Sequence, residues 1–235
     1  MRLPALNVVE LRQYTLKAGY RETLIEIFDR HFVEGQEETG MTVLGQFRDL
    51  QRPERFVWLR GFPDMEERHR SLERFYGGPI WAEHRDAANA TMLEFDDVLL
   101  LKPARPGAGV AVDPAQRPAP GDSAAPAGLV LAGIHLLQRP ADEKVLRIFE
   151  RQVFPGLTAQ GVDLLGFYVT EHAKNTYRLP VREGENAVVW LGRLPEERLG
   201  VGAEIAARTE TALSGRLAAP STILELAPTR RSLLR

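Results

Sequence analysis

The feature that most constrains this chain is an internal repeat. When the sequence is shifted by 121 positions, Leu24, Ile27, Phe28, Arg30 and Phe32 align with Val145, Ile148, Phe149, Arg151 and Val153. At the same offset, Gly40, Leu44, Gly45 and Phe47 align with Gly161, Leu165, Gly166 and Tyr168. The matching residues keep their order and length changes fall in predicted loops, which indicates a duplicated unit. The chain then divides into two units of roughly 105 residues, each large enough to bury a core.

Each unit is predicted to follow the order β-α-β-β-α-β. In the first unit, apolar patterns predict strands at 8–16, 42–47, 56–62 and 91–101, and helices at 18–39, 65–75 and 80–87. In the second unit they predict strands at 129–137, 164–169, 187–192 and 221–226, and helices at 141–160 and 196–213. Gly40 is the expected stop of the first helix. This order is typical of a ferredoxin-like unit, so the expected fold class is α+β with two such units in tandem.

A linker is predicted between the two units. Residues 103–127 are almost only Pro, Gly, Ala and small polar residues, which predicts an extended or mobile tether that builds no core. The predicted domains are therefore a first unit at 1–103, a linker at 104–127 and a second unit at 128–235. Each unit leaves one face of its sheet bare, and pairing the two sheets inside one chain would cover both faces. We expect a small-molecule pocket between the sheets.

Composition excludes several classes of protein. The formal net charge is −2, so no basic surplus indicates a nucleic-acid partner. There are no cysteines, which excludes disulfides and thiolate catalysis. No apolar stretch approaches the length of a membrane span and no signal peptide is visible, so we expect a cytoplasmic protein without a membrane partner. Phosphate-loop and dinucleotide motifs are missing and five histidines are scattered, so we expect neither a cofactor nor a metal site.

Three segments of the first unit resemble one known family. Residues 9–19, with the run Glu10-Leu11-Arg12-Gln13-Tyr14, are similar to the first strand of the NIPSNAP family and its Glu-Leu-Arg-x-Tyr signature. Residues 56–68 and 75–89 resemble that family as well, so the resemblance covers residues 7–103. It implies the dimeric α+β barrel fold, here formed within one chain. It implies no established reaction, although neighbouring barrel families include oxygenases, dehydratases and haem-degrading enzymes.

The two units differ in polar and aromatic residues. Trp81, His84, Asp86 and Asn89 align with Ala212, Gly215, Leu217 and Pro220, whereas Arg85 is kept as Arg216. Arg60 aligns with Gly192, and Tyr14 aligns with His135. These differences indicate that the first unit carries a site and that the second is a scaffold or lid. The alternative is drift after duplication.

The candidate catalytic residues are His84, Arg85 and Arg60. The imidazole of His84 titrates near neutral pH and could transfer a proton, while Arg85 or Arg60 stabilises negative charge. The candidate substrate-binding residues share an aromatic or polar character: Trp58, Tyr76, Trp81, Asn89, Tyr14 and His135. The alternatives are that His84 flanks a surface helix and that Trp58, which recurs as Trp190, is a packing residue.

Two strand faces of the first unit carry charge. Arg12 and Tyr14 share one face of the first strand, and Trp58 and Arg60 share one face of the third. We place Arg60 on the bare sheet face, where a buried cation needs an anionic partner from a ligand or from a carboxylate such as Glu10 or Glu94. The charged run 64–70 is read as an ordinary solvated helix start.

Three functions follow from this sequence. The leading hypothesis is a small-molecule-binding protein of the NIPSNAP type, with cofactor-independent oxygenation or acid/base rearrangement as its chemistry. The second is a non-catalytic binding or assembly module, which predicts a filled interface between the sheets. The third is a haem-handling barrel. Exposed sheet edges would also allow homo-oligomerisation.

Overall fold

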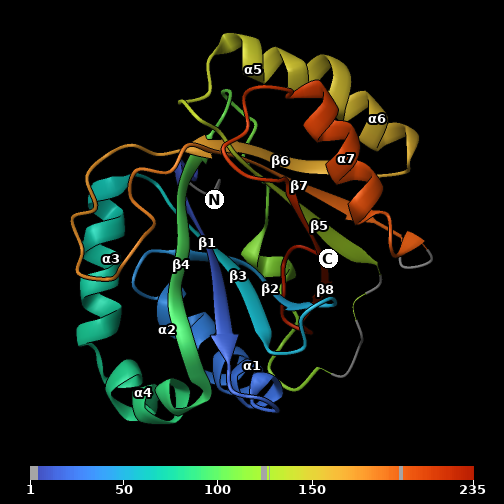
Figure 1. Ribbon diagram of the computed structural model, residues 1–235. Helices are drawn as coiled ribbons and strands as arrows, with labels where there is room; N and C mark the ends of the chain where they lie inside the picture. Colours follow the sequence, from blue (N-terminus) through green and yellow to red (C-terminus); the bar gives the residue numbers. More distant parts are fainter. Residues whose placement is uncertain (1–4, 123–125, 127, 196–197) are drawn as a thin grey trace.

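The computed structural model describes residues 5–122, 126, 128–195 and 198–235 (Figure 1). We call the part up to residue 103 the first half and the part from residue 128 the second half. The strands of the first half are β1 (Val8–Leu16), β2 (Thr42–Asp49), β3 (Arg55–Phe62) and β4 (Met92–Pro103). Its helices are α1 (Arg21–Ile27), α2 (Val33–Glu37), α3 (Met65–Gly77) and α4 (Pro79–Thr91).

The second half has the same order of elements. Its strands are β5 (Leu129–Leu136), β6 (Asp163–Thr170), β7 (Ala187–Leu194) and β8 (Thr222–Pro228). Its helices are α5 (Glu143–Ile148), α6 (Phe154–Ala159) and α7 (Gly202–Ala212). The helix predicted at 196–213 corresponds to α7, and its predicted start at Glu196 lies outside the described residues. So do the predicted domain limits at residues 1 and 127.

Local sequence signals account for the helix ends and for a feature that both halves share. The side chain of Asp64 accepts hydrogen bonds from the backbone N–H groups of Glu66 and Glu67 and caps α3. Gly40 has a φ of 103°, which suits its predicted role as the stop of the first helical segment. In each half a π-helical turn joins two α-helices, at Phe28–Phe32 and at Phe149–Val153. The two turns are 121 positions apart.

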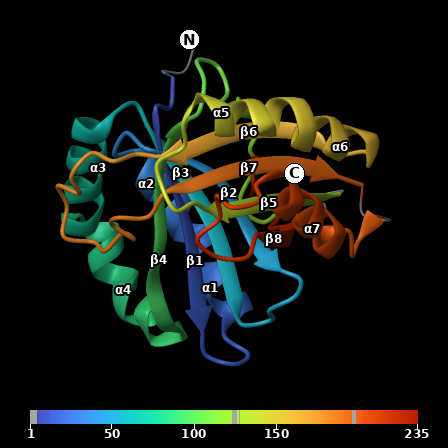
Figure 2. The ribbon, with the colours of Figure 1, turned by 45° about the horizontal axis from the view of Figure 1, so that its top comes forward.

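All eight strands close into one antiparallel barrel. Their order is β1-β3-β2-β8-β5-β7-β6-β4, and β4 pairs with β1 (Figure 2). The halves join at two seams, where β2 pairs with β8 and β4 pairs with β6. The predicted α+β barrel formed within one chain is therefore confirmed. Because the sheet edges are engaged with each other at these seams, the edge-based argument for homo-oligomerisation loses its support.

The barrel interior is filled with apolar side chains from both halves. Its core is formed by Val9, Leu11, Leu44, Phe47, Val57, Leu59, Leu99, Leu101, Val110, Val130, Ala132, Ile134, Tyr168, Ala187, Val189, Leu191, Leu224, Leu226 and Leu234. Aliphatic residues from both sheets interdigitate there. A cleft of about 540 Å³, lined by Val112, Leu165 and Leu234 at the edge of this core, is the space that remains for the expected pocket. A filled interior is what the alternative of a binding or assembly module predicts.

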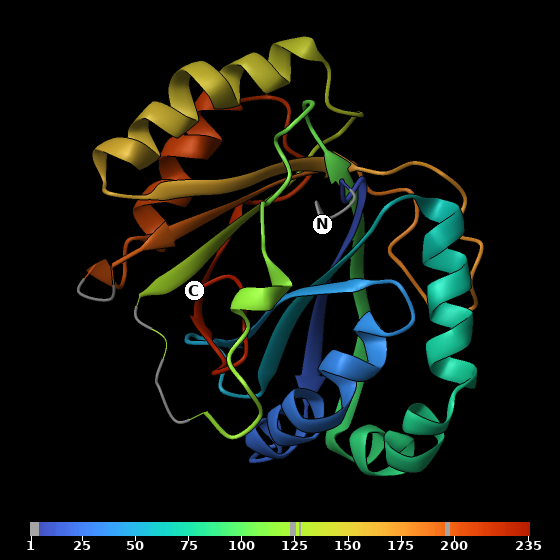
Figure 3. The same ribbon diagram turned by 180° about the vertical axis from the view of Figure 1, so that it is seen from behind.

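The helices cover the outside of the barrel in two separate layers. Helices α1–α4 pack on the strands of the first half and α5–α7 on those of the second (Figure 1). The segment after residue 103 runs along the barrel (Figure 3). The prediction that this linker builds no core is wrong, because Val110 belongs to the barrel core. Val110 is only 8% exposed and its backbone N–H donates to the hydroxyl of Tyr168 at 2.7 Å. Arg117 of the same segment donates to Glu37 at 2.6 Å.

Candidate functional site

Three arginines and one glutamate are buried between the first-half sheet and its helices. Glu10 and Arg12 lie on β1, Arg60 on β3 and Arg68 on α3, and we call these four residues the arginine cluster. Each is at most 1% exposed. Glu10 and Arg12 project from the same face of β1 because strand side chains alternate. Arg60 joins them because the antiparallel register places it directly opposite Glu10.

A single carboxylate accepts hydrogen bonds from all three arginines. One oxygen of Glu10, Oε2, accepts from Nη1 of Arg12 at 2.6 Å and from Nε of Arg60 at 2.8 Å. The other oxygen, Oε1, accepts from Nε of Arg68 at 2.7 Å. Three guanidinium groups thus face one carboxylate, which leaves an excess of two formal positive charges within the cluster. A buried excess of charge is costly unless further groups compensate it.

Neutral acceptors satisfy part of this excess. Nη1 of Arg60 donates to Oε1 of Gln36 at 3.0 Å, and Nε of Arg12 donates to the hydroxyl of Tyr14 at 2.9 Å. In contrast, Nη2 of Arg60 and Nη2 of Arg68 are buried without a hydrogen-bond partner among the described residues. Such buried N–H donors have lost their hydrogen bonds to water and have gained none from the protein. They are therefore available to an acceptor on a ligand.

The electrostatics of the cluster keep its acid ionised. Burial alone would raise the pKa of Glu10, but the charges of Arg60, Arg12 and Arg68 outweigh burial and hold that pKa far below its usual value. Burial raises the pKa of Tyr14, so its hydroxyl is neutral at physiological pH. The cluster therefore offers fixed positive charge and does not offer a group that titrates near pH 7.

Aromatic rings line the cluster. The guanidinium carbon of Arg60 lies 5.0 Å from the ring centroid of Trp58 and 5.7 Å from that of Tyr76. Arg12 lies 5.4 Å from the ring centroid of Tyr14. The ring of Trp81 packs edge-on against Tyr76 at 4.8 Å. The three guanidinium–ring distances are within the range of cation–π attraction, and the rings form an apolar surface beside the charges.

A loop of the second half covers the site. Residues 171–186, between β6 and β7, lie beside α3 in both front and back views (Figures 1 and 3). Oδ1 of Asn175 accepts from Nη1 of Arg68 at 3.0 Å, and the ring of Tyr177 stacks on Tyr76 at 6.1 Å. The backbone carbonyl of Thr176 lies 2.9 Å from Nδ1 of His69. The second half thus completes a site whose charges all belong to the first.

The strand-face predictions are partly confirmed. Arg12 and Tyr14 share a face, and Glu10 is the carboxylate partner of both Arg12 and Arg60, as expected. The placement of Arg60 and Trp58 on the bare face is wrong, since both lie on the face covered by helices. The opposite face, with Leu11 and Leu59, points into the barrel.

The remaining first-half candidates lie away from the cluster. The ring of His84 stacks on that of His31, with centroids 3.8 Å apart. Arg85 is exposed and has Asp86 as its ion-pair partner at 3.4 Å. Asn89 is exposed near the end of α4. No hydrogen bond joins these three side chains to the arginine cluster within the described part of the chain, so their predicted roles stay predictions.

His135 is buried in the second half, remote in sequence from the cluster. Its Nε2 accepts from Nε1 of Trp190 at 3.0 Å, and its Nδ1 lies 2.8 Å from Oγ of Ser221. Burial lowers the pKa of His135 to about 3, so the imidazole is neutral at physiological pH. Both ring nitrogens are engaged in these contacts, which is the pattern of a packing histidine.

Sequence reasoning missed Arg68, Gln36 and Asn175. Arg68 was read as part of a solvated run, but it is fully buried. A signal was present, because Arg68 lies four residues before Leu72 and seven before Phe75, and all three are buried on one face of α3. No local signal could have brought Asn175 to Arg68, because 107 positions separate them.

The described residues include neither a metal-ligand cluster nor a helix that could span a membrane. No group of three or more His, Asp or Glu side chains there is arranged to hold a metal ion. Among the helices of the described ranges, none is both long and apolar enough to cross a membrane.

Comparisons with solved structures support the fold. A candidate monooxygenase from Fusobacterium nucleatum is 10% identical with a TM-score of 0.57, and the match covers 95% of this chain and 93% of that one. A candidate monooxygenase from Lactobacillus acidophilus is 11% identical with a TM-score of 0.53, covering 95% and 94%. An anthrone oxidase-like protein is 10% identical with a TM-score of 0.54, covering 97% and 94%. At these identities the likeness shows the fold alone.

The family comparison concerns the half that holds the cluster. A search of curated proteins finds no match to this sequence. The profile of the NIPSNAP family matches residues 9–105, which include the Glu10-Leu11-Arg12 run, Arg60 and Arg68. The match confirms the predicted resemblance of the first half, which supplies every charge of the arginine cluster, to the NIPSNAP family.

Proposed function

We propose that the first half binds a small organic acid, whose carboxylate is held by the arginine cluster and whose apolar body rests against the aromatic rings. The observation that carries this proposal is the pair of unpartnered, fully buried donors, Nη2 of Arg60 and Nη2 of Arg68. Two guanidinium groups in a water-poor setting favour a carboxylate strongly, because charge-assisted hydrogen bonds are stronger there than in water.

The neighbouring rings favour an acid with an aromatic or flat apolar body. Tyr76, Trp81 and Tyr177 are partly exposed and meet beside Arg60. Such rings contribute affinity through stacking and edge contacts. The covering loop supplies Tyr177 and Asn175, so access to the buried donors would require that loop to move.

The chemistry that follows binding is a narrower proposal. The fold relatives named as candidate monooxygenases make oxidation by dioxygen the first reaction to assay on a bound acid. The alternative is an acid/base rearrangement in which His84 moves the proton. Localisation in the cytoplasm and homo-oligomerisation also stay predictions.

The test measures binding of benzoate and of its neutral analogue benzamide by isothermal titration calorimetry. We expect benzoate to bind and benzamide to bind at least about tenfold more weakly, which corresponds to about 1.4 kcal/mol. Arg68→Met should abolish the preference for benzoate. Arg85→Ala is the matched control, because this arginine is exposed and lies outside the cluster.

A second variant guards against a fold defect in Arg68→Met. Tyr177→Ala alters only a partly exposed residue of the covering loop, and we expect it to weaken benzoate binding without a loss of helical circular dichroism. Equal binding of benzoate and benzamide, or no binding of either at millimolar concentration, would overturn the proposal. The cluster would then be an internal ion network that supports the fold.

A further inference from the structure

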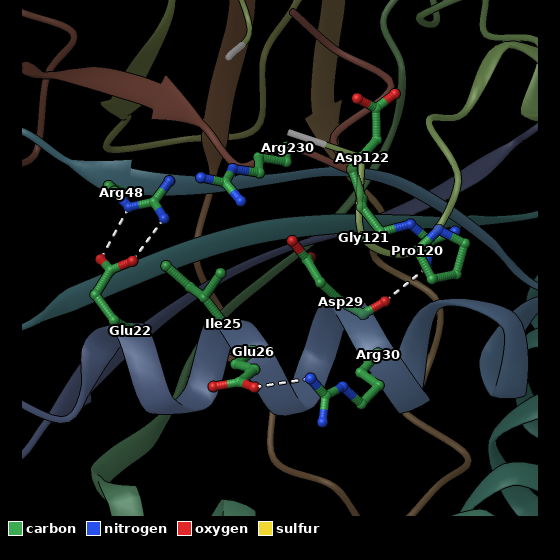
Figure 4. A pocket seen from close by; sticks show the side chains of 11 residues that line it. Glu22, Ile25, Glu26, Asp29, Arg30, Arg48, Pro120, Gly121, Asp122 and Arg230 are labelled. Atoms are coloured by element: carbon green, nitrogen blue, oxygen red, sulfur yellow. Dashed lines mark hydrogen bonds and ion pairs between the residues drawn. The ribbon is translucent and has the colours of Figure 1, made fainter. Parts of the chain in front are cut away.

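A second candidate site lies in a cleft of about 420 Å³ beside α1. Four parts of the chain form it: α1 with the π-helical turn that carries Asp29, strand β2, the segment 120–122 and the segment 230–231 (Figure 4). None of its lining residues belongs to the arginine cluster. This cleft is therefore separate from the site proposed to bind an organic acid.

Most charges around the cleft are already paired. Arg48 makes a bidentate contact with Glu22, at 2.9 and 2.6 Å. Arg30 pairs with Glu26 at 3.0 Å. The guanidinium of Arg231 binds both carboxylate oxygens of Glu34. These pairs build the walls of the cleft and leave their members little capacity for a ligand.

Asp29 is an exception among the acids. Its Oδ1 accepts only weak, neutral hydrogen bonds, from Nε2 of Gln46 and from Oγ1 of Thr229, each at 3.3 Å. Arg231 donates to the backbone carbonyl of Asp29 at 2.6 Å and not to its carboxylate. Figure 4 shows that carboxylate directed into the cleft. Within the described residues no cation pairs with it.

Arg230 is the exception among the cations. It is exposed, and it forms no ion pair or hydrogen bond with any other residue in the described ranges. In Figure 4 its side chain extends over the cleft toward Arg48. The cleft thus presents one unpaired carboxylate and one unpaired guanidinium, with Ile25 and Pro120 as apolar wall.

We infer that this cleft binds a small zwitterion of the aliphatic α-amino acid class, with the ammonium group at Asp29 and the carboxylate at Arg230. An ammonium group donates up to three hydrogen bonds, which suits the Asp29 carboxylate because it accepts only weak ones. The guanidinium of Arg230 can bind a ligand carboxylate through two parallel hydrogen bonds. The aliphatic side chain contacts Ile25 and Pro120. A ligand with only one of the two charges would leave the other protein charge unsatisfied.

The protonation of Asp29 gives this site a second readout. Burial raises the pKa of Asp29 to about 6. The other charged groups that line the cleft come from every element around it: Glu22, Glu26, Arg30, Arg48, Asp122, Arg230 and Arg231. Because an ammonium ligand needs the ionised carboxylate, its affinity should fall about tenfold from pH 7.5 to pH 5.0, in proportion to the ionised fraction.

The experiment compares three probes that share the branched aliphatic chain of leucine. L-leucine carries both charges, 4-methylpentanoate lacks the ammonium group and 3-methylbutylamine lacks the carboxylate. By calorimetry at pH 7.5 we expect leucine to bind and each truncated probe to bind at least about tenfold more weakly. Asp29→Asn and Arg230→Ala should each abolish leucine binding, and Arg139→Ala, an exposed arginine of the second half, should not change it.

Several results would overturn the inference. Leucine could fail to bind at millimolar concentration, or bind no better than 4-methylpentanoate. Arg230→Ala could bind leucine as the wild type does, and this variant is informative because its exposed position does not endanger the fold. Leucine affinity that is equal at pH 7.5 and pH 5.0 would remove Asp29 from the site.

Discussion

The two halves of the barrel place different chemistry in the same frame. In the first half, Glu10 lies opposite Arg60 and Arg12 opposite Trp58 in the β1–β3 register. In the second half, the corresponding pairs in the β5–β7 register are Leu131 with Gly192 and Gly133 with Trp190. The frame is thus the same, whereas one half buries charges under its helices and the other buries none at these positions.

The second half fills the equivalent space with one indole ring. A Cβ atom added to Gly133 would lie 2.2 Å from Cε2 of Trp190, and one added to Gly192 would lie 2.4 Å from Val162. Gly133 thus makes room for Trp190, which His135 anchors through its Nε2, and Gly192 makes room for the neighbouring Val162. Apolar side chains that pack in this way need no hydrogen-bond partner. A buried charge cluster, in contrast, loses the hydration of its charged groups, which lowers the stability of the fold. A ligand-binding role would explain why the first half keeps a buried charge cluster that lowers its stability.

The largest expected effect on stability is that of changing Glu10, the carboxylate of the arginine cluster. Glu10→Gln leaves three buried arginines without an ion-pair partner, and we expect it to lower the free energy of unfolding by about 3–5 kcal/mol. Urea denaturation at pH 7 measures this change. A loss below about 1 kcal/mol would mean that the arginines find other acceptors, and the contrast between the halves would weaken.

The sign of the pH dependence for Glu10 follows from its depressed pKa. The folded-state pKa is far below the unfolded value of 4.5, so the carboxylate contributes stability above about pH 4.5 that is lost progressively as the pH falls. The stability difference between wild type and Glu10→Gln should therefore shrink from pH 6 to pH 3. A constant difference would contradict the ion-pair account.

The next effect tests the apolar filling of the second half. Gly133→Ala forces a methyl group into Trp190, and overpacking of this kind costs about 1–3 kcal/mol. In a Trp190→Ala background the same change should cost much less, because the indole is gone. A double-mutant cycle by urea denaturation measures the coupling, and the absence of coupling would disprove the proposed use of Gly133.

A smaller effect distinguishes His135 from its counterpart Tyr14. Since burial lowers the folded-state pKa of His135 to about 3, its contribution to stability is present above the unfolded value of 6.5 and is lost as the pH falls. Between pH 7.5 and pH 5.0 the loss should be about 2 kcal/mol. His135→Phe should remove this slope, and Tyr14→Phe should leave it in place. Thermal melts across this pH range measure both.

The smallest effect is expected at the surface and serves as a reference. Glu22→Gln removes the charge that pairs with Arg48, and the side chain of Glu22 is 61% exposed. We expect a loss below about 1 kcal/mol, because water and salt screen such pairs. If this loss equalled that of Glu10→Gln, burial would not be what separates the two ion pairs.

Local order along the chain was within reach of the sequence. Apolar alternation predicts β1 at the residues where it forms, Gly40 ends the first helical segment, and Asp64 caps α3. The partnership of Glu10 with Arg12 also follows from two-residue spacing on one strand. These features depend on neighbours in the chain, and short-range geometry is encoded in short segments.

The face of the sheet that holds the site was decided by tertiary structure. Along β1, Val9 and Leu11 on one face and Val8 on the other are all apolar and buried, so alternation could not tell the barrel interior from the helix-covered side. Closure at the β2–β8 and β4–β6 seams fixed that choice and filled the interior.

The sequence by itself therefore determined the helices and strands, their order and the oppositely charged residues that pair, because these depend on local geometry and on charge. Tertiary structure decided that Arg68 is buried, that Asn175 of the other half reaches it, and that Asp29 and Arg230 share a cleft. The physical reason is that burial and long-range contact follow from how the halves pack. That packing depends on the whole set of side chains and not on any one segment.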